Sequence, residues 1–285
     1  MDAADLPTIL AYVSRDRARS LVRSMFPKRR WRVIAAHDAG EFASTLRRIL
    51  VDAALVDIGS PLALAALASA GNGSPFAATN GGTADETWKI AALAQEFPSA
   101  PFFAITPLRA TDAPAVARCG ALDFCDVIAD GIDEPVAREL VAPQTFSARF
   151  YTALVNPPPV LRLETPMQLA TWRTILSGGG RPVRTSALAN AAGVSREHLS
   201  RNFSLPGSPN LKRIIDLVRM IAAAELAKNP GLDIKDIARI LGFASSSHLA
   251  VTAQRVMGTR PASLSRLRTV DLIERFVQGR TRSRG

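Results

Sequence analysis

The sequence is poor in the residues that build metal centres, disulfides and histidine-based catalytic sites. It has two cysteines, Cys119 and Cys125, and three histidines, His37, His198 and His248. The cysteines lack metal-ligand spacing to a histidine, so we expect no metal and free, buried thiols in a reducing cytosol. Only His37 lies in the N-terminal half, which leaves that half without the residues for a histidine-based triad.

The chain also lacks the sequence signatures of common enzymes and of membrane insertion. No glycine-rich phosphate loop follows the first predicted strand and no nucleophile elbow is present, so we expect neither a cofactor nor an enzyme. The longest Ala/Leu run, residues 62–70, is far below the length of a membrane span. The acidic residues 1–5 do not resemble the start of a signal peptide, and the expected location is cytoplasmic, without membrane contact.

Charge is distributed unevenly over the 285 residues. Residues 1–140 hold 14 Lys and Arg against 17 Asp and Glu, whereas residues 141–285 hold 21 against 8. Hydrophobic residues make up 47% of the chain, which is enough for two folded cores. A basic half joined to a mildly acidic half is typical of a nucleic-acid-binding domain attached to a second domain.

The N-terminal half alternates between short apolar runs and amphipathic segments. This alternation predicts an α/β domain, flavodoxin-like, with a five-stranded parallel sheet covered by helices on both faces. The predicted strands are 8–13, 31–36, 53–58, 101–106 and 124–128, and the predicted helices are 16–26, 40–50, 62–70, 83–97, 113–119 and 133–141. Residues 71–82, rich in Gly, Asn and Ser, read as an exposed loop.

The C-terminal half contains two similar segments, residues 185–203 and 233–255. Each predicts a short helix, a break at Gly193 or Gly242, and a second short helix that starts at a serine. This pattern is typical of a helix-turn-helix, so we expect an all-α domain with two such motifs. Residues 209–228 contain no Gly and predict a connecting helix of about 30 Å.

These two segments together resemble the DNA-binding domain of AraC/XylS-type transcription regulators. The resemblance covers roughly 165–270, under half of the chain, and the spacing of its two half-motifs makes it specific. The residues that carry it are Leu188-Ala189, Gly193-Val194-Ser195, His198 to Arg201, Phe203, Arg219, Ala223, Ile237-Ala238, Leu241-Gly242-Phe243, Ser247-His248-Leu249, Gly258 and Pro261.

The resemblance implies that the second helix of each motif contacts DNA. In the first motif these residues are Arg196, Glu197, Ser200 and Arg201, with Arg196 better placed for phosphate, and in the second they are Ser246, Ser247, His248 and Val251. Arg201 can bind guanine and Glu197 can accept from cytosine, whereas Val251 replaces the usual arginine and can contact only a thymine methyl group. We therefore expect the first motif to dominate base recognition.

The N-terminal half is similar to a response-regulator receiver domain. The similarity lies in Asp57 with Pro61 four residues later, in Thr106, and in Gly120 to Phe124. The pattern departs where a receiver holds Mg²⁺ and transfers phosphate. Val13-Ser14-Arg15-Asp16 replaces the acid pair, and Val127 replaces the lysine. We expect Asp57 to be a structural residue paired with Arg15; phosphorylation of Asp57 is the alternative.

The predicted organisation is a receiver-like domain over 1–142, a linker over 143–164 and a DNA-binding domain over 165–285. The expected function is sequence-specific regulation of transcription, with double-stranded DNA, a second copy of the chain and RNA polymerase as partners. The N-terminal half would serve dimerisation or partner sensing. The alternatives are a phosphorylation-controlled response regulator using Asp57, an enzyme on the flavodoxin-like half, and an architectural DNA binder without sequence choice.

Overall fold

The computed structural model divides the chain into two compact units, Met1–Phe146 and Ser147–Gly285. It describes residues 6–69, 86–204 and 208–282, so the loop expected at 71–82 lies outside the described residues. Among the helices in these described ranges, none is long and apolar enough to cross a membrane.

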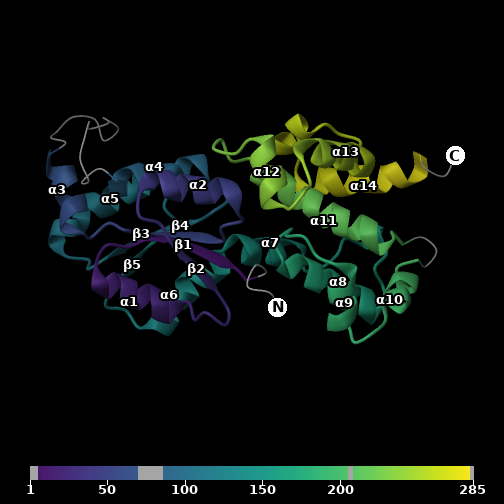
Figure 1. Ribbon diagram of the computed structural model, residues 1–285, viewed down its shortest axis with the longest axis horizontal. Helices are drawn as coiled ribbons and strands as arrows, with labels where there is room; N and C mark the ends of the chain where they lie inside the picture. Colours follow the sequence, from purple (N-terminus) through teal and green to yellow (C-terminus); the bar gives the residue numbers. More distant parts are fainter. Residues whose placement is uncertain (1–5, 70–85, 205–207, 283–285) are drawn as a thin grey trace. The chain divides into compact units, whose positions relative to one another are not determined.

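The N-terminal unit is built on a five-stranded parallel sheet with strand order β2-β1-β3-β4-β5 (Figure 1). This order confirms the predicted doubly wound fold. The strand β1 (Thr8–Tyr12) lies between β2 and β3. The chain therefore adds β2 on one side of β1 and all later strands on the other side. The remaining strands are β2 (Arg32–Ala35), β3 (Ala53–Asp57), β4 (Phe102–Thr106) and β5 (Asp126–Ala129).

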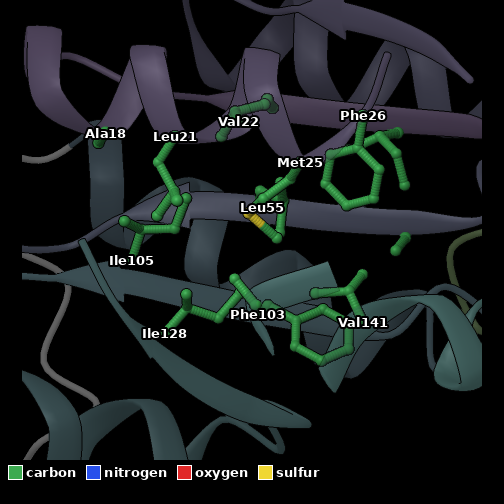
Figure 2. Close-up of a cluster of buried hydrophobic side chains, with 14 residues drawn as sticks. Ala18, Leu21, Val22, Met25, Phe26, Leu55, Phe103, Ile105, Ile128 and Val141 are labelled. Atoms are coloured by element: carbon green, nitrogen blue, oxygen red, sulfur yellow. The ribbon is translucent and has the colours of Figure 1, made fainter. Parts of the chain in front are cut away.

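Helices cover both faces of this sheet, and alternate strand residues form a core on each side. On one face, α1 (Asp16–Met25) and α6 (Glu134–Val141) pack over β1, β3, β4 and β5. Figure 2 shows Leu21 and Met25 of α1 above Leu55, Phe103 and Ile128 of the strands. The helices α2 (Ala39–Arg48), α3 (Pro61–Ser69), α4 (Glu86–Glu96) and α5 (Ala113–Ala121) complete the unit, with 3₁₀ turns at Ala110–Asp112 and Ala142–Gln144.

The last strand of the sheet begins two residues later than the sequence pattern predicted. Asp123 adopts a left-handed conformation with φ of 60°, and pairing with β4 begins only at Asp126. The aromatic Phe124 therefore belongs to the turn before β5. The expectation of two buried thiols is half wrong, because Cys119 is buried and Cys125 in the same turn is exposed. Burial raises the pKa of the Cys119 thiol to about 12.

The C-terminal unit is entirely helical, as predicted. Its two motifs are α9 (Thr185–Ala191) with α10 (Arg196–Asn202), and α12 (Ile234–Ile240) with α13 (Ser246–Met257). The connecting helix α11 (Leu211–Leu226) lies between them in the chain and supplies twelve buried residues to the core. The other helices are α7 (Phe146–Leu154), α8 (Pro166–Ser177) and α14 (Thr269–Arg282), with 3₁₀ turns at Pro159–Leu161 and Pro261–Arg266.

The connecting helix is shorter than predicted. It has 16 residues because Asn210 caps its first turn, so it is about 24 Å long rather than 30 Å. Pro261 begins a 3₁₀ turn, and extended backbone at Leu267 separates that turn from α14.

The segment proposed as a linker, residues 143–164, contains α7 and a 3₁₀ turn. Trp172 of α8 is fully buried and donates its indole N–H to the carbonyl of Leu154 at 2.8 Å. This bond ties the end of α7 to the C-terminal unit. The finer division into 1–142, 143–164 and 165–285 remains a proposal.

Two glycines of the helix-turn-helix motifs provide a matched test of the fold. Gly193 and Gly242 have φ of 66° and 63°, but a Cβ at Gly242 would lie 2.3 Å from Cγ of Pro182, whereas a Cβ at Gly193 meets nothing within 4 Å. We expect Gly193→Ala to cost about 1 kcal/mol of unfolding free energy, and Gly242→Ala at least about 2 kcal/mol, because it adds a steric clash to the backbone strain.

The comparison can be measured by urea unfolding of the fragment 147–285. Its one tryptophan, Trp172, is buried and reports the transition by fluorescence. Equal losses in the two variants would contradict the close approach of Pro182 to Gly242.

Candidate nucleic-acid interface and receiver-like site

The first motif forms a tight turn between two seven-residue helices. Ala189 is buried where α9 and α10 meet, and its carbonyl accepts a hydrogen bond from the backbone N–H of Val194 at 3.0 Å. Ser195 caps α10, since its hydroxyl accepts from the N–H of His198 at 3.1 Å. The cap was predicted from the sequence and is confirmed. Val194, the residue after the glycine of the turn, is half-buried.

The residues predicted to contact DNA lie together on the exposed side of α10. Arg196, Glu197, Ser200 and Arg201 are all exposed, while Leu199 points into the core. The pKa of Glu197 is lowered, first by a hydrogen bond to its own backbone and then by Ser195 and the neighbouring arginines. Its carboxylate therefore stays ionised at neutral pH and is available as an acceptor.

A buried amide side chain fixes the C-terminal end of α10 to the start of α8. Gln168 is 0% exposed, and its Nε2 donates to the carbonyl of Asn202, the last residue of α10, at 3.0 Å. The Oε1 of Gln168 accepts from the backbone N–H groups of Glu164 and Thr165 at 2.9 and 3.0 Å. The Thr165 hydroxyl donates to Oδ1 of Asn202 at 2.9 Å. None of these contacts was predicted from the sequence.

The second motif repeats the geometry with different side chains. Asp233 caps α12 and forms the predicted capping box with Asp236. Phe243 is buried beneath the turn, as expected, and Ser245 caps α13 by accepting from the N–H of His248 at 3.1 Å. Both caps hold the start of a short helix in place.

Three of the four predicted contact residues of α13 are exposed. These are Ser247, His248 and Val251, which is 64% exposed although it is a large apolar residue, whereas Ser246 is half-buried. Ala253 on the same helix is fully buried. The exposed face of α13 thus carries hydroxyls, an imidazole and a methyl surface, but no positive charge among these four residues.

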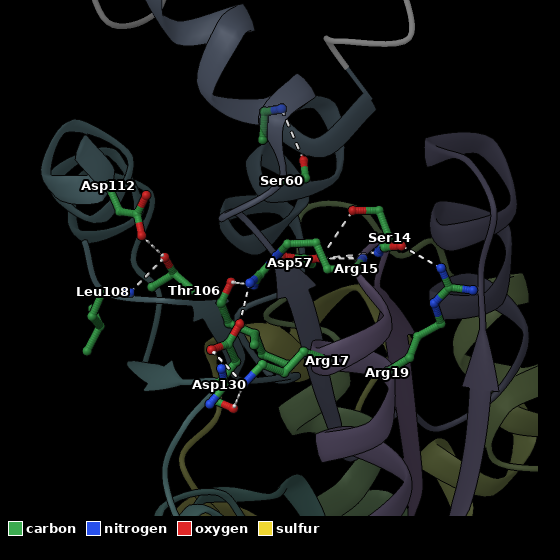
Figure 3. Close-up of polar contacts among 12 residues, drawn as sticks. Ser14, Arg15, Arg17, Arg19, Asp57, Ser60, Thr106, Leu108, Asp112 and Asp130 are labelled. Carbon is green, nitrogen blue, oxygen red and sulfur yellow. Dashed lines mark hydrogen bonds and ion pairs between the residues drawn. The ribbon is translucent and has the colours of Figure 1, made fainter. Parts of the chain in front are cut away.

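In the N-terminal unit, a guanidinium group occupies the acidic edge of the sheet. Asp57, at the end of β3, is 0% exposed and accepts from the backbone N–H groups of Ser14 and Arg15 at 3.2 and 2.9 Å. It also accepts from the Ser14 hydroxyl at 3.1 Å and from Nε of Arg15 at 2.8 Å. Figure 3 shows Arg15 between Asp57 and Asp130, with which it forms a second ion pair.

The predicted pairing of Arg15 with Asp57 is therefore observed, and Asp130 completes it. Burial disfavours the charge of Arg15, but the two carboxylates outweigh this effect and raise the pKa of the guanidinium. Asp130 follows β5 directly, and the carboxyl ends of parallel strands meet at one edge, a signal that could have identified it. The Thr106 hydroxyl donates to Asp112 at 2.7 Å, and both carboxylate oxygens of Asp57 accept hydrogen bonds from Ser14 or Arg15.

Residues 188–266 match the model of a family described as a helix-turn-helix domain, a span that begins within α9 and continues to the end of the last 3₁₀ turn. A curated relative, the HTH-type transcriptional regulator GlxA of Rhizobium meliloti (strain 1021), is 30% identical over 164 residues.

The C-terminal unit carries a helix-turn-helix domain.

The match to this relative covers 57% of this chain and 47% of the relative, so the chain spans about half the length of that protein. The matched helix-turn-helix family and the name of this relative agree with the expectation of a regulator rather than an enzyme.

A solved structure, full-length FixJ from B. japonicum, aligns with a TM-score of 0.31 and 11% identity, covering 76% of this chain and 97% of that chain. A TM-score of this size carries no structural argument. The doubly wound fold of the N-terminal unit therefore rests on its own strand order.

The site around Asp57 predicts a chain that does not accept phosphate. We expect incubation with acetyl phosphate and Mg²⁺ to leave the intact mass of the protein unchanged, because Ser14 and Arg15 already engage both carboxylate oxygens of Asp57. Asp57→Asn is the matched control. A stoichiometric, Mg²⁺-dependent adduct in the wild type that disappears in this variant would contradict the prediction.

Proposed function

We propose that this protein is a sequence-specific transcription regulator that reads double-stranded DNA with α10 and α13. The observation that carries the proposal is the pair of helix-turn-helix motifs, each with a second helix that is capped by a serine and exposes predicted contact residues. The matched domain family covers both motifs from Leu188 onwards. The basic C-terminal half supplies the favourable field for the phosphate backbone.

The two motifs have unequal roles in this proposal. In α10, Arg201 makes a bidentate contact to guanine, Glu197 accepts from cytosine N4, and Arg196 contacts phosphate. In α13, Ser246, Ser247 and His248 contribute position and hydrogen bonds, while Val251 packs against a thymine methyl group. Since none of these four residues of α13 is an arginine, and Arg255 of the same helix is paired with Asp216, α10 dominates base recognition.

A matched pair of substitutions tests this division of roles. Arg201→Ala should weaken binding to the selected site by about 1–3 kcal/mol and relax the preference at one base position. Val251→Ala should change binding little, because it removes only apolar contact. Titration of both variants against specific and random duplexes by fluorescence anisotropy measures the effects.

Two outcomes would contradict the assignment. Equal weakening of Arg201→Ala on specific and random DNA would make Arg201 a phosphate contact. If the wild type itself bound both duplexes equally, the protein would be an architectural binder without sequence choice.

The N-terminal unit is proposed to bring two chains together. Its Asp57 site is filled by the chain's own arginine, and residues 1–140 carry little net charge, so association or partner sensing fits this unit better than catalysis. A second chain raises the effective concentration of the reading helices at DNA without a new base contact. RNA polymerase is a further proposed partner, and a chromosomal target would place the protein in the cytoplasm.

Assembly can be tested by sedimentation of the two compact units. We expect the fragment 1–146 to be a dimer and the fragment 147–285 to be a monomer that binds DNA more weakly than the full chain. Its affinity should fall steeply with salt, because lysine and arginine contacts to phosphate release counterions. A monomeric 1–146, with full-length protein binding no tighter than 147–285, would remove the dimerisation role.

A further inference from the structure

Three charged side chains follow one another along the connecting helix and contact different elements of the C-terminal unit. Arg213, Asp216 and Arg219 are spaced by three residues, which places them close to one face of α11. Asp216 accepts from Arg255 of α13 at 2.8 Å. Each of the two arginines lies over a phenylalanine ring and donates to a backbone carbonyl, Arg213 at α14 and Arg219 at the turn of the second motif.

Arg219 holds the turn of the second motif. Its Nη2 donates to the carbonyl of Leu241 at 2.8 Å, and its guanidinium lies 3.8 Å from the centre of the Phe243 ring. Leu241 is the C-cap of α12, where helix carbonyls have no partner within the helix. A single side chain of α11 therefore satisfies the end of α12 and stacks on the residue that leads into α13.

The contact continues from Phe243 into the first turn of α13. The ring of Phe243 meets the imidazole of His248 edge to face, with ring centroids 5.6 Å apart and an interplanar angle of 80°. His248 is itself tied to the cap residue Ser245 through its backbone N–H. Guanidinium, phenyl ring and imidazole thus form one stack from α11 to the exposed face of α13.

The first motif has no equivalent of this stack among its described residues. Val194 stands where Phe243 stands in the second motif and is half-buried, and α10 is fixed at its far end by Gln168 and Asn202. The two reading helices are consequently held by separate groups, so a change at one need not disturb the other.

We propose that Arg219 is a positioning residue that sets the orientation of the first turn of α13, and with it the base preference of the second motif. The inference rests on the proposed function, because it assumes that α13 contacts DNA. Arg219 acts through Phe243 and His248 and not through a DNA contact of its own. Its substitution should therefore change selectivity under α13 without changing non-specific affinity.

Arg219→Lys is the informative substitution. Lysine keeps the positive charge but has no planar fork with which to stack on Phe243 while donating to Leu241. We expect discrimination at the base positions under α13 to fall about 3- to 10-fold, the loss of a half-buried cation–π contact and a hydrogen bond. Preference at the positions under α10 and affinity for random DNA should remain at wild-type levels.

Arg213→Lys is the matched control on the same helix. Arg213 also lies over a phenylalanine ring, Phe276 of α14, at 4.9 Å, and donates from Nη2 to the carbonyl of Phe276 at 3.3 Å. The buried Nε atoms of Arg213 and Arg219 both lack a hydrogen-bond partner among the described residues. Because α14 is not a reading helix, Arg213→Lys should leave base preference unchanged.

The experiment is selection of a randomised duplex library by the full chain, followed by sequencing. Positions that change in Arg201→Ala define the α10 segment, and positions that change in Ser247→Ala define the α13 segment. Phe243→Leu is a second variant, which keeps an apolar side chain beneath the turn but removes the aromatic ring. It should lose base preference at the same positions as Arg219→Lys. The variant that carries both substitutions should lose no more base preference than either single variant.

The outcomes separate this inference from the proposed function. The positioning role is supported if Arg219→Lys and Phe243→Leu lose base preference only in the α13 segment and Arg213→Lys keeps the wild-type preference. Unchanged preference in the first two variants, or an equal loss in Arg213→Lys, overturns it while leaving the regulator intact. A wild type that enriches no sequence would overturn both. If Arg219→Lys does not fold, as judged by circular dichroism, Phe243→Leu decides alone.

Discussion

Three of the four helices in the two motifs are too short to be stable by themselves, and the rest of the C-terminal unit compensates for that. The helices α9, α10 and α12 have seven residues each, about two turns, whereas an isolated helix in water needs about 12–15 residues. Ser195 caps α10 and Asp233 caps α12, and the buried residues Leu199, Ile237 and Ile240 attach these two helices to the core. The orientation of each reading face is thus decided by its attachments.

Those attachments differ between the motifs, and the difference has a chemical logic. The first motif is closed by neutral amide and hydroxyl bonds from α8, at the start of the DNA-binding domain. The second is closed by charged groups of α11, through Arg219 to the α12 turn and through Asp216 to Arg255 of α13. Arg219 is partly desolvated, and burial lowers its pKa. The desolvation of the guanidinium costs free energy unless its contacts with Leu241 and Phe243 are kept. This cost favours one defined arrangement of the turn in the second motif.

The local part of this design could be predicted from the sequence, and the long-range part could not. The serine caps, Gly193 and Gly242, the capping box of Asp233 and the sheet order all follow from short patterns or alternation. Asp130, the bond of Gln168 to Asn202 and the stack of Arg219 on Phe243 join residues 24 to 115 positions apart, and no spacing rule connects them. The prediction for the start of β5 was wrong for a local reason, because Asp123 adopts a left-handed conformation although it is not a glycine.

The N-terminal unit raises a separate question, which is how a signal could reach the DNA-binding domain. A metal-bound phosphate site can change its charge, because both the ion and the phosphoryl group exchange with solvent. Arg15 is part of the chain, and its pairing with Asp57 and Asp130 gives this edge a charge balance that does not vary with the ligand supply. Breaking a buried pair of this kind costs several kcal/mol, so the arrangement persists once formed. We infer that any control by this unit acts through what it associates with, such as a second chain or a protein partner, rather than through chemistry at Asp57.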